Sequence, residues 1–360
     1  MEDSVGVSEE EREMLRHSVR GLLEAKWPVE GAVERSAEAK AILDIWADCA
    51  KQGLSALGAD PQEAGLSEIM LVFDELGRAS CPAPLLGAIS ANLLLAGSAS
   101  ANQAASEMLD GLHQGSASPA IVLAAFDGDA AAGRVEYGNG VLSGRVQFVE
   151  GAGLATHFVV LSDDPAGAAI VPADASGLEI TPTPGLAVPS LSEITLSATP
   201  ASLIELPASR LAEIAEINRM ACVARALGAA SRAFDLALEH TTLRSQFGKL
   251  IGQFQAIQHK LADCLVRLDG SRLLIESAAQ THDRGDPSWV VFASTALAYA
   301  SPALRQVILE AHHTLGAIGY AEEHEAPRHF RRVHADLVRF GGAGRARAQL
   351  AEHLLGPIGQ

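Results

Sequence analysis

The chain has 360 residues, of which 48% are hydrophobic and 20% charged, a balance typical of a folded protein with two or three domains. Its 27 Lys and Arg residues against 44 Asp and Glu give a net charge of −17, which excludes the broad basic face that nucleic-acid binding needs. No apolar run approaches the roughly 18 residues that span a bilayer.

The acidic start, with Glu9, Glu10 and Glu11, is unlike a secretory signal or a transit peptide. The cysteines lie far apart and form no CxxC pair, so we expect reduced thiols in the core of a cytoplasmic protein. They are Cys49, Cys81, Cys222 and Cys264.

The first segment, residues 1–115, is expected to be a helical domain. Ser8 and Glu11 have the spacing of a capping box, and apolar residues then recur at helical intervals. Further helical patterns follow, and a turn at Gly77 is expected to end one of them. A helix is also expected over 85–95, and a stretch rich in small residues, 111–119, marks the boundary.

The second segment, residues 116–206, changes to short runs rich in β-branched residues. Asn139-Gly140 between two such runs is a strong signal for a β-hairpin. Frequent Gly, Pro and Asp residues separate the runs, so this segment predicts a compact antiparallel β-barrel or sandwich.

The third segment, residues 207–360, returns to a helical period and predicts a four-helix bundle. One helix is expected to run to about Thr242 and the next to begin near Gln253. Asp286-Pro287 is a typical start for a third helix. The fold class is therefore α+β with three domains: helical, β-barrel and helix bundle.

Common catalytic motifs are missing from this sequence. It holds no GxxxxGK[ST], GxSxG, HExxH or GxGxxG in a suitable context. A di-iron centre in a bundle requires two Glu-x-x-His pairs, whereas only Glu310 and His313 have that spacing. We therefore expect no metal.

The most informative stretch is RSQFGKLIGQFQAIQ, residues 244–258, which lies between two expected helices. An arginine fork at such a junction suits a diphosphate, and nearby apolar residues can flank a flat ring. The residues alone are equally compatible with an ordinary turn whose Arg244 is solvated.

This stretch is similar to the flavin-diphosphate motif of acyl-CoA dehydrogenases, and the order of the three segments resembles that family over nearly the whole chain. FDELGR at 73–78, LSG at 142–144 and GAIGY at 316–320 add to the resemblance. The resemblance implies that FAD lies between two subunits, with Arg244 at the diphosphate. The implied FAD-binding residues are Arg244, Gln246, Phe247, Ile251, Phe254, Ile257, His313, Gly316 and Ala317.

Two of these positions depart from the family pattern. The family usually has Gln where His313 stands and Gly where Ala317 stands.

The family's catalytic base is not found at either usual position. Dehydrogenation of an acyl thioester needs a carboxylate to remove the α proton. Ungapped counting places Phe340 and Gly341 at the C-terminal position of this glutamate, and Asn218 at the alternative position ahead of the arginine motif. None of these residues can accept a proton, so no catalytic residue is assigned.

The segments that serve the flavin ring in relatives also differ here. The corresponding stretches are 124–127, Ala-Ala-Phe-Asp, and 148–150, Phe-Val-Glu. Glu150 would bring negative charge toward a ring that becomes electron-rich on reduction, which disfavours hydride uptake.

The half of the site for the diphosphate and adenine is thus retained, while the half for the reacting ring and base is not. This pattern resembles actinobacterial steroid side-chain acyl-CoA dehydrogenases, which are α2β2 assemblies. It implies a non-catalytic subunit that completes the FAD site of a catalytic acyl-CoA dehydrogenase-like partner, with a steroid side-chain acyl-CoA as substrate and an electron-transfer acceptor.

Two alternatives stay open at this point. One is a self-sufficient homotetrameric dehydrogenase that recruits a displaced acid: Glu213, Glu216 or Asp336. The other is a flavin-free structural subunit.

Overall fold

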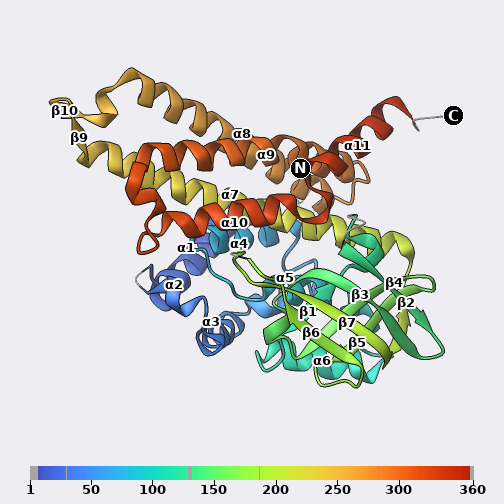
Figure 1. Cartoon of the computed structure of the whole chain (residues 1–360). Helices are drawn as coiled ribbons and strands as arrows, with labels where there is room; N and C mark the ends of the chain where they lie inside the picture. Colours follow the sequence, from blue (N-terminus) through green and yellow to red (C-terminus); the bar gives the residue numbers. More distant parts are fainter. Residues whose placement is uncertain (1–6, 30, 129–131, 186, 357–360) are drawn as a thin grey trace. The chain divides into compact units, whose positions relative to one another are not determined.

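The computed structural model describes residues 7–29, 31–128, 132–185 and 187–356 (Figure 1). By packing, these residues form two compact units. One holds Ser36–Gly65 and Pro82–Asn218, and the other holds Ser8–Arg35, Leu66–Cys81 and the residues from Arg219 onward. The proposed boundaries of the three sequence segments remain predictions.

The first third of the chain is helical, as expected. Ser8 Oγ accepts a hydrogen bond from the Glu11 amide, and the Glu11 carboxylate accepts one from the Ser8 amide, so the predicted capping box is formed. The helices are α1 (Glu9–Lys26), α2 (Ala32–Arg35), α3 (Ala39–Lys51), α4 (Leu66–Arg78), α5 (Leu85–Leu95) and α6 (Gln103–His113).

The expected turn at Gly77 is wrong, because Gly77 lies inside α4. It is needed instead where α4 meets α7 (Ala208–Leu243): a Cβ on Gly77 would lie 1.8 Å from the Arg225 carbonyl oxygen. Gly228 on α7 has the matching role, since its Cβ would lie 1.8 Å from the Asp74 carbonyl oxygen. The absence of side chains at these two positions lets the two helix backbones approach closely.

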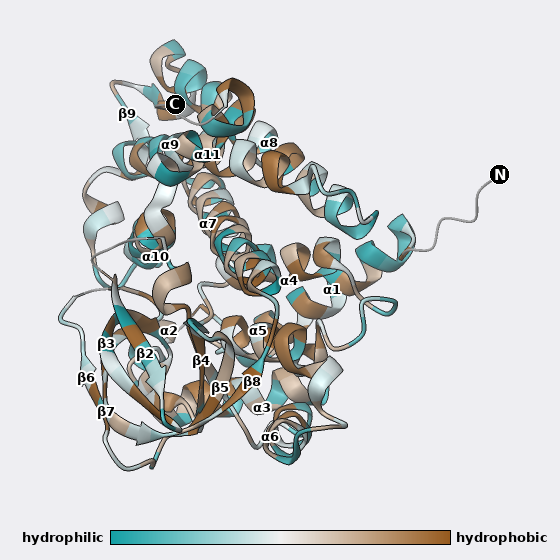
Figure 2. Ribbon diagram, turned by 90° about the vertical axis from the view of Figure 1, so that its right-hand side faces the viewer, coloured by the Kyte–Doolittle hydropathy of each residue, from teal (hydrophilic) through white to brown (hydrophobic). Residues whose placement is uncertain are grey.

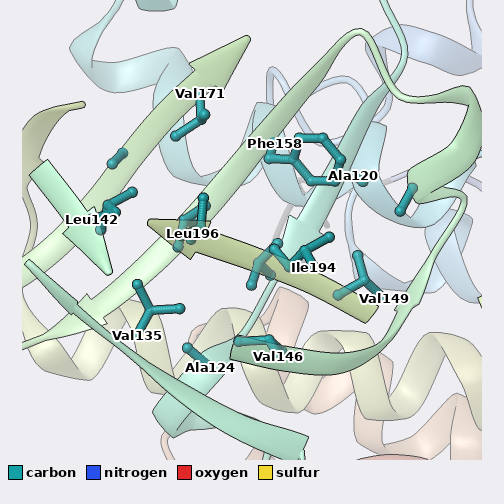
Figure 3. Close-up of a cluster of buried hydrophobic side chains, with 14 residues drawn as sticks. Ala120, Ala124, Val135, Leu142, Val146, Val149, Phe158, Val171, Ile194 and Leu196 are labelled. Carbon is teal, nitrogen blue, oxygen red and sulfur yellow. The ribbon is translucent and has the colours of Figure 1, made fainter. Parts of the chain in front are cut away.

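The middle segment forms two four-stranded sheets around one core, to which both sheets contribute buried residues (Figure 3). The first sheet has the order β1-β4-β5-β8 and the second β2-β3-β7-β6. The strands are β1 (Pro119–Val122), β2 (Gly133–Gly138), β3 (Val141–Glu150), β4 (His157–Asp163), β5 (Ala166–Pro172), β6 (Leu178–Pro182), β7 (Leu191–Pro200) and β8 (Ser202–Glu205).

The expectation of a wholly antiparallel arrangement is wrong for one pair, because β1 and β4 run parallel. The hairpin at Asn139-Gly140 is confirmed: it joins the antiparallel strands β2 and β3, with φ of 52° and 78° at its two central residues. Positive φ at both positions is the type I′ geometry that suits the strand twist. Figure 2 shows apolar stretches, in brown, along β4, β5 and β8 of the first sheet.

The last segment is helical throughout, apart from a short hairpin. Its helices after α7 are α8 (Gln255–Asp283), α9 (Trp289–Leu315), α10 (Ala326–Val338) and α11 (Gly342–Leu355). The third long helix begins at Trp289 rather than at Pro287, because Asp286 forms a turn in which its side chain accepts from the Ser288 amide. α8 packs on α9, and α10 and α11 also pack against α9.

Candidate functional site

A two-stranded hairpin joins α7 to α8 and carries most of the expected cofactor residues. Its strands, β9 (Ser245–Gln246) and β10 (Lys249–Leu250), are antiparallel. Phe247 and Gly248 between them have φ of 51° and 79°, which again defines a type I′ turn. The left-handed conformation is ordinary for Gly248 but unusual for an aromatic residue, so Phe247 is held in a strained conformation at an exposed tip.

The side chains of this hairpin are presented outward. Phe247 is 93% exposed and contacts the edge of Phe254, with ring centroids 6.3 Å apart. Lys249 Nζ lies 4.2 Å from the centre of the Phe254 ring, a cation–π contact. Gln246 is also exposed. The tip therefore combines an aromatic pair with a lysine charge.

Arg244 has a fixed main chain and an exposed side chain. Its amide donates to the His240 carbonyl, and its carbonyl accepts from the Ile251 amide over 2.8 Å. Within the described ranges no acidic group forms an ion pair with Arg244. Burial, followed by the positive charge of Arg244, lowers the pKa of His240. This arginine therefore contributes an uncompensated positive charge that is suited to an anion.

The apolar residues that follow Arg244 are less exposed than the tip. Ile251 is buried, whereas Phe254 and Ile257, at the start of α8, are half-buried. They form a partly covered apolar surface next to the hairpin.

The second expected cofactor segment is the end of α9 and the turn after it, η7 (Gly316–Tyr320). His313 is exposed, with Nδ1 3.6 Å from the Glu310 carboxylate, and Gly316 has φ of 64°. Ala317 is exposed as well.

Both expected segments lie at the same end of the helical bundle (Figure 1). Leu236 near the end of α7, Leu315 at the end of α9 and Ala326 at the start of α10 form one buried apolar cluster there. The structure thus brings together the segments that the sequence motif and the GAIGY turn singled out.

The Asn218 position holds a fixed amide instead of a base. Asn218 is 1% exposed, and its Nδ2 donates to Ser90 Oγ over 3.0 Å and to the Ile214 carbonyl over 2.8 Å. The amide therefore serves to tie α5 to α7 within one compact unit.

The second base position, Phe340, is equally closed to proton transfer. Phe340 is buried and has φ of 55°, and the Arg339 guanidinium lies 4.6 Å from the centre of its ring. Its carbonyl accepts a hydrogen bond from Arg219 Nε over 3.2 Å. Gly341 follows, also with positive φ. An aromatic ring and a main-chain turn thus occupy the place where a carboxylate was sought.

The structure shows the surroundings of the three acids that were considered as alternative bases. Asp336 is 3% exposed, and its carboxylate accepts two hydrogen bonds from Arg225, over 2.9 and 2.7 Å. Glu213 pairs with Arg210 over 2.7 Å and is partly exposed, while Glu216 is buried. Asp336 is engaged in a bidentate pair and cannot serve as a base without losing it.

Arg225 is a residue that the sequence reasoning missed. The signal was present: it is a single arginine in a stretch of α7, 220–230, that is otherwise apolar or small. A buried charge needs a partner of opposite charge, but the sequence of this stretch does not identify that partner.

The segments expected near a flavin ring lie in the β-sheet region. Ala124–Phe126 forms a short 3₁₀ turn with Ala124 buried. A bulge in β3 leaves Phe148 exposed with φ of 62°, whereas Glu150 is buried. The described residues place no hydroxyl side chain in either stretch.

Comparison with known proteins agrees with this architecture. A family model described as "Acyl-CoA dehydrogenase, C-terminal domain" matches residues 210–355. The acyl-CoA dehydrogenase IpdE2 of Mycobacterium tuberculosis is 30% identical over 335 residues, which cover 90% of this chain and 91% of that protein. The chain therefore belongs to the acyl-CoA dehydrogenase family.

A further relative matches over a shorter region. Cyclohex-1-ene-1-carbonyl-CoA dehydrogenase of Geobacter metallireducens is 37% identical over 123 residues, and the match covers 34% of this chain and about a third (32%) of that protein.

Two solved structures, each described with two joined protein names, are close in fold. The Tcur3481–Tcur3483 steroid acyl-CoA dehydrogenase, as a G363A variant, has a TM-score of 0.85 at 25% identity, covering 96% of this chain and 98% of that chain. The ChsE4–ChsE5 complex of Mycobacterium tuberculosis has a TM-score of 0.82 at 20% identity, covering 99% and 100%.

Within the part of the chain that the structure describes, each helix is too short or too polar to cross a bilayer.

Proposed function

We propose that this chain is the non-catalytic subunit of an FAD-dependent acyl-CoA dehydrogenase and that it completes the flavin site of a catalytic partner. The reaction introduces a double bond between the α and β carbons of an acyl-CoA. FAD, when bound, supplies the ring that accepts the β hydride. A carboxylate must take the α proton, and in this proposal the partner provides it.

The observation that carries the proposal is the contrast between the two halves of the site. Asn218 is held by Ser90 and Ile214, and Phe340 is buried against Arg339, so neither base position can accept a proton. Arg244, by contrast, is exposed on a well-formed hairpin. Such a chain has groups that can bind the phosphates of a cofactor, but it lacks the base that reaction at the cofactor's ring requires.

The cofactor would be held by this chain at its diphosphate and adenine end. Arg244 would bind the diphosphate as a planar fork, and the exposed Phe247 and half-buried Phe254 would pack near it. His313 and Ala317 would approach from the end of α9. The full proposed set is Arg244, Gln246, Phe247, Ile251, Phe254, Ile257, His313, Gly316 and Ala317.

The donor set fits this role, because Arg244 at the base of the hairpin and Lys249 within it supply positive charge, and Phe247 and Phe254 supply aromatic surface.

We further propose an α2β2 assembly in the cytoplasm, a steroid side-chain acyl-CoA as substrate and a separate electron-transfer acceptor. Likeness to the Tcur3481–Tcur3483 steroid acyl-CoA dehydrogenase and to the ChsE4–ChsE5 complex supports this assignment.

Arg244→Ala in the purified complex with its partner tests the role of the hairpin. Loss of charge-assisted hydrogen bonds to a diphosphate weakens binding by about 10- to 100-fold. We expect flavin content, measured from visible absorbance after desalting, to fall accordingly. Arg134→Ala, at an exposed arginine on β2, is the matched control and should leave flavin content unchanged. Unchanged flavin content and activity in Arg244→Ala would contradict the proposal.

A further inference from the structure

The end of α9 and the elements after it are rich in histidine. Five of the twelve histidines of the chain lie between residues 312 and 334, where α9, the turn η7 and α10 follow one another. His312 differs from its neighbour His313, because it is 3% exposed whereas the side chain of His313 is 64% exposed. The proposed cofactor site gives this buried ring no role.

One hydrogen bond defines the protonation of His312 in the folded chain. Its Nδ1 lies 3.0 Å from the carbonyl oxygen of Ile308, one turn earlier in α9. A carbonyl oxygen only accepts, so Nδ1 carries the hydrogen of the neutral ring, and Nε2 is the atom that a second proton has to occupy.

The His312 ring contacts an aromatic ring in each of the two elements that follow α9. Its centroid is 5.7 Å from that of Tyr320 in η7 and 4.8 Å from that of Phe330 on α10, both in T-shaped arrangements. Of the five residues of η7, four are exposed and only Gly319 is buried. A turn with so little buried surface depends on the contact between Tyr320 and His312 for its place on the bundle.

A positive charge on His312 is poorly compensated. Burial lowers the pKa of His312, the hydrogen bond to Ile308 opposes this effect, and the charges of His324, His334 and His313 lower the pKa further.

The acids near His312 bind other cations or are exposed. A lysine or an arginine binds the carboxylates of Glu310, Glu322 and Glu325, while Glu323 is exposed. The charged and titratable groups of the surrounding elements are Arg232, Glu239 and His240 on α7, Lys260 on α8, Glu310 and His313 on α9, Tyr320 in η7, Glu322, Glu323, His324 and Glu325 before α10, and Arg328, His329, Arg331 and His334 on α10.

We propose that His312 is a positioning residue whose neutral ring holds η7 in place, and that its protonation releases this turn from α9 and α10. The native state favours the neutral ring, so the turn is held above the ordinary histidine pKa of 6.5 and opens more often as the pH falls below it. Gly316 and Ala317 belong to this turn. A weaker hold on the cofactor at acid pH therefore also follows, and this second effect rests on the proposed function.

Hydrogen exchange of the purified chain, followed by mass spectrometry, measures the opening of the turn. The amides of Gly316 and Ala321 donate to the carbonyls of His312 and Ile318, so they exchange when the turn opens. After division by the intrinsic exchange rates, opening should rise by up to about tenfold from about pH 7.5 to about pH 5.5. His312→Phe keeps an aromatic ring and His312→Gln keeps a polar side chain, but neither takes up a proton, so both should abolish this rise.

His17→Phe, at an exposed histidine on α1, is the matched control and should keep the rise seen in the wild type. Opening that is independent of pH in the wild type, or a rise that persists in both His312 variants, would overturn the inference.

The flavin content of the complex separates this inference from the proposed function. The wild-type complex should lose more flavin on desalting at about pH 5.5 than at about pH 7.5, and His312→Phe should reduce this acid loss. If opening of the turn depends on His312 while flavin content is independent of pH, the positioning role of His312 is confirmed and the proposed role of Gly316 and Ala317 toward the cofactor is wrong.

Discussion

The guanidinium of Arg225 donates two hydrogen bonds to the carboxylate of Asp336, and the side chains of both residues are 1% exposed. The pair links α7 to α10, and Arg219 on α7 donates to the carbonyl of Phe340, which lies in the turn after α10. The region in which ungapped counting places the family's glutamate is thus held by arginines that bind other groups. This arrangement disfavours the alternative in which Asp336 acts as a displaced base.

Asp336→Asn should destabilise the protein strongly. Removing the acidic partner of a buried ion pair takes from Arg225 the carboxylate that accepts two of its hydrogen bonds, which costs about 3–5 kcal/mol. Urea unfolding followed by circular dichroism measures this loss. Asp163→Asn, at an exposed acid 3.6 Å from Arg134, is the control and should change the unfolding free energy by less than about 1 kcal/mol. Wild-type stability in Asp336→Asn would show that Asp336 is available for another role.

Phe247→Gly should separate turn stability from cofactor binding. Phe247 adopts a left-handed conformation with its ring 93% exposed, so glycine relieves about 1 kcal/mol of strain and sacrifices little packing. We expect an unchanged or higher melting temperature together with reduced flavin retention in the complex.

The hairpin at residues 139–140 supplies the control for this experiment. Asn139→Gly makes the same kind of change in a type I′ turn between β2 and β3, and it should leave flavin retention unaltered. Equal flavin retention in wild type and Phe247→Gly would remove Phe247 from the proposed site.

Neither Asn218→Glu nor Phe340→Glu should create dehydrogenase activity in the isolated chain. In our proposal this chain lacks the groups that surround the flavin ring, so adding a carboxylate alone does not produce a working active site. Asn218→Glu should also cost about 1–3 kcal/mol, because the hydrogen bonds that Asn218 donates to Ser90 and Ile214 are lost. Dye-linked assays with straight-chain and steroid-derived acyl-CoA thioesters measure the activity. Turnover by either variant would mean that the ring pocket is intact.

The ionised carboxylate of Glu325 is expected to stabilise the folded protein, and this contribution should be lost at low pH. Burial raises the pKa of its carboxyl, but hydrogen bonds from His329 and Arg232 outweigh burial and hold the pKa at about 2, below the ordinary 4.5. The native state thus favours the ionised form, so this stabilisation is complete above pH 4.5 and is lost as the pH falls toward 2.

Glu325→Gln should therefore be less stable than the wild type by about 3 kcal/mol at pH 7, and this difference should shrink between pH 4.5 and 2. Urea unfolding at a series of pH values gives the comparison. A difference that stays constant across this range would show that ionisation of Glu325 is not the cause.

The sequence was most informative where structure depends on near neighbours. The capping box at Ser8, the hairpin at Asn139 and the helix over 85–95 each follow from residues a few positions apart, and each is confirmed. Gly77 was misjudged because its role depends on contact with Arg225, which lies far along the chain.

Long-range pairing explains the other misses. The parallel pairing of β1 with β4 and the ion pair between Arg225 and Asp336, 111 positions apart, leave no periodic signal in the sequence. At the candidate site, the motif at 244–258 predicted a junction between helices, and the structure has one there. The roles of its residues toward FAD are still predictions, because binding depends on a second subunit.

The most direct test is to purify this chain alone and together with an acyl-CoA dehydrogenase-like product of an adjacent gene, and to record visible spectra and subunit stoichiometry. The proposal predicts a colourless chain alone and about one flavin per pair of unlike subunits in the complex. A yellow homotetramer of this chain that bleaches on addition of an acyl-CoA would contradict it.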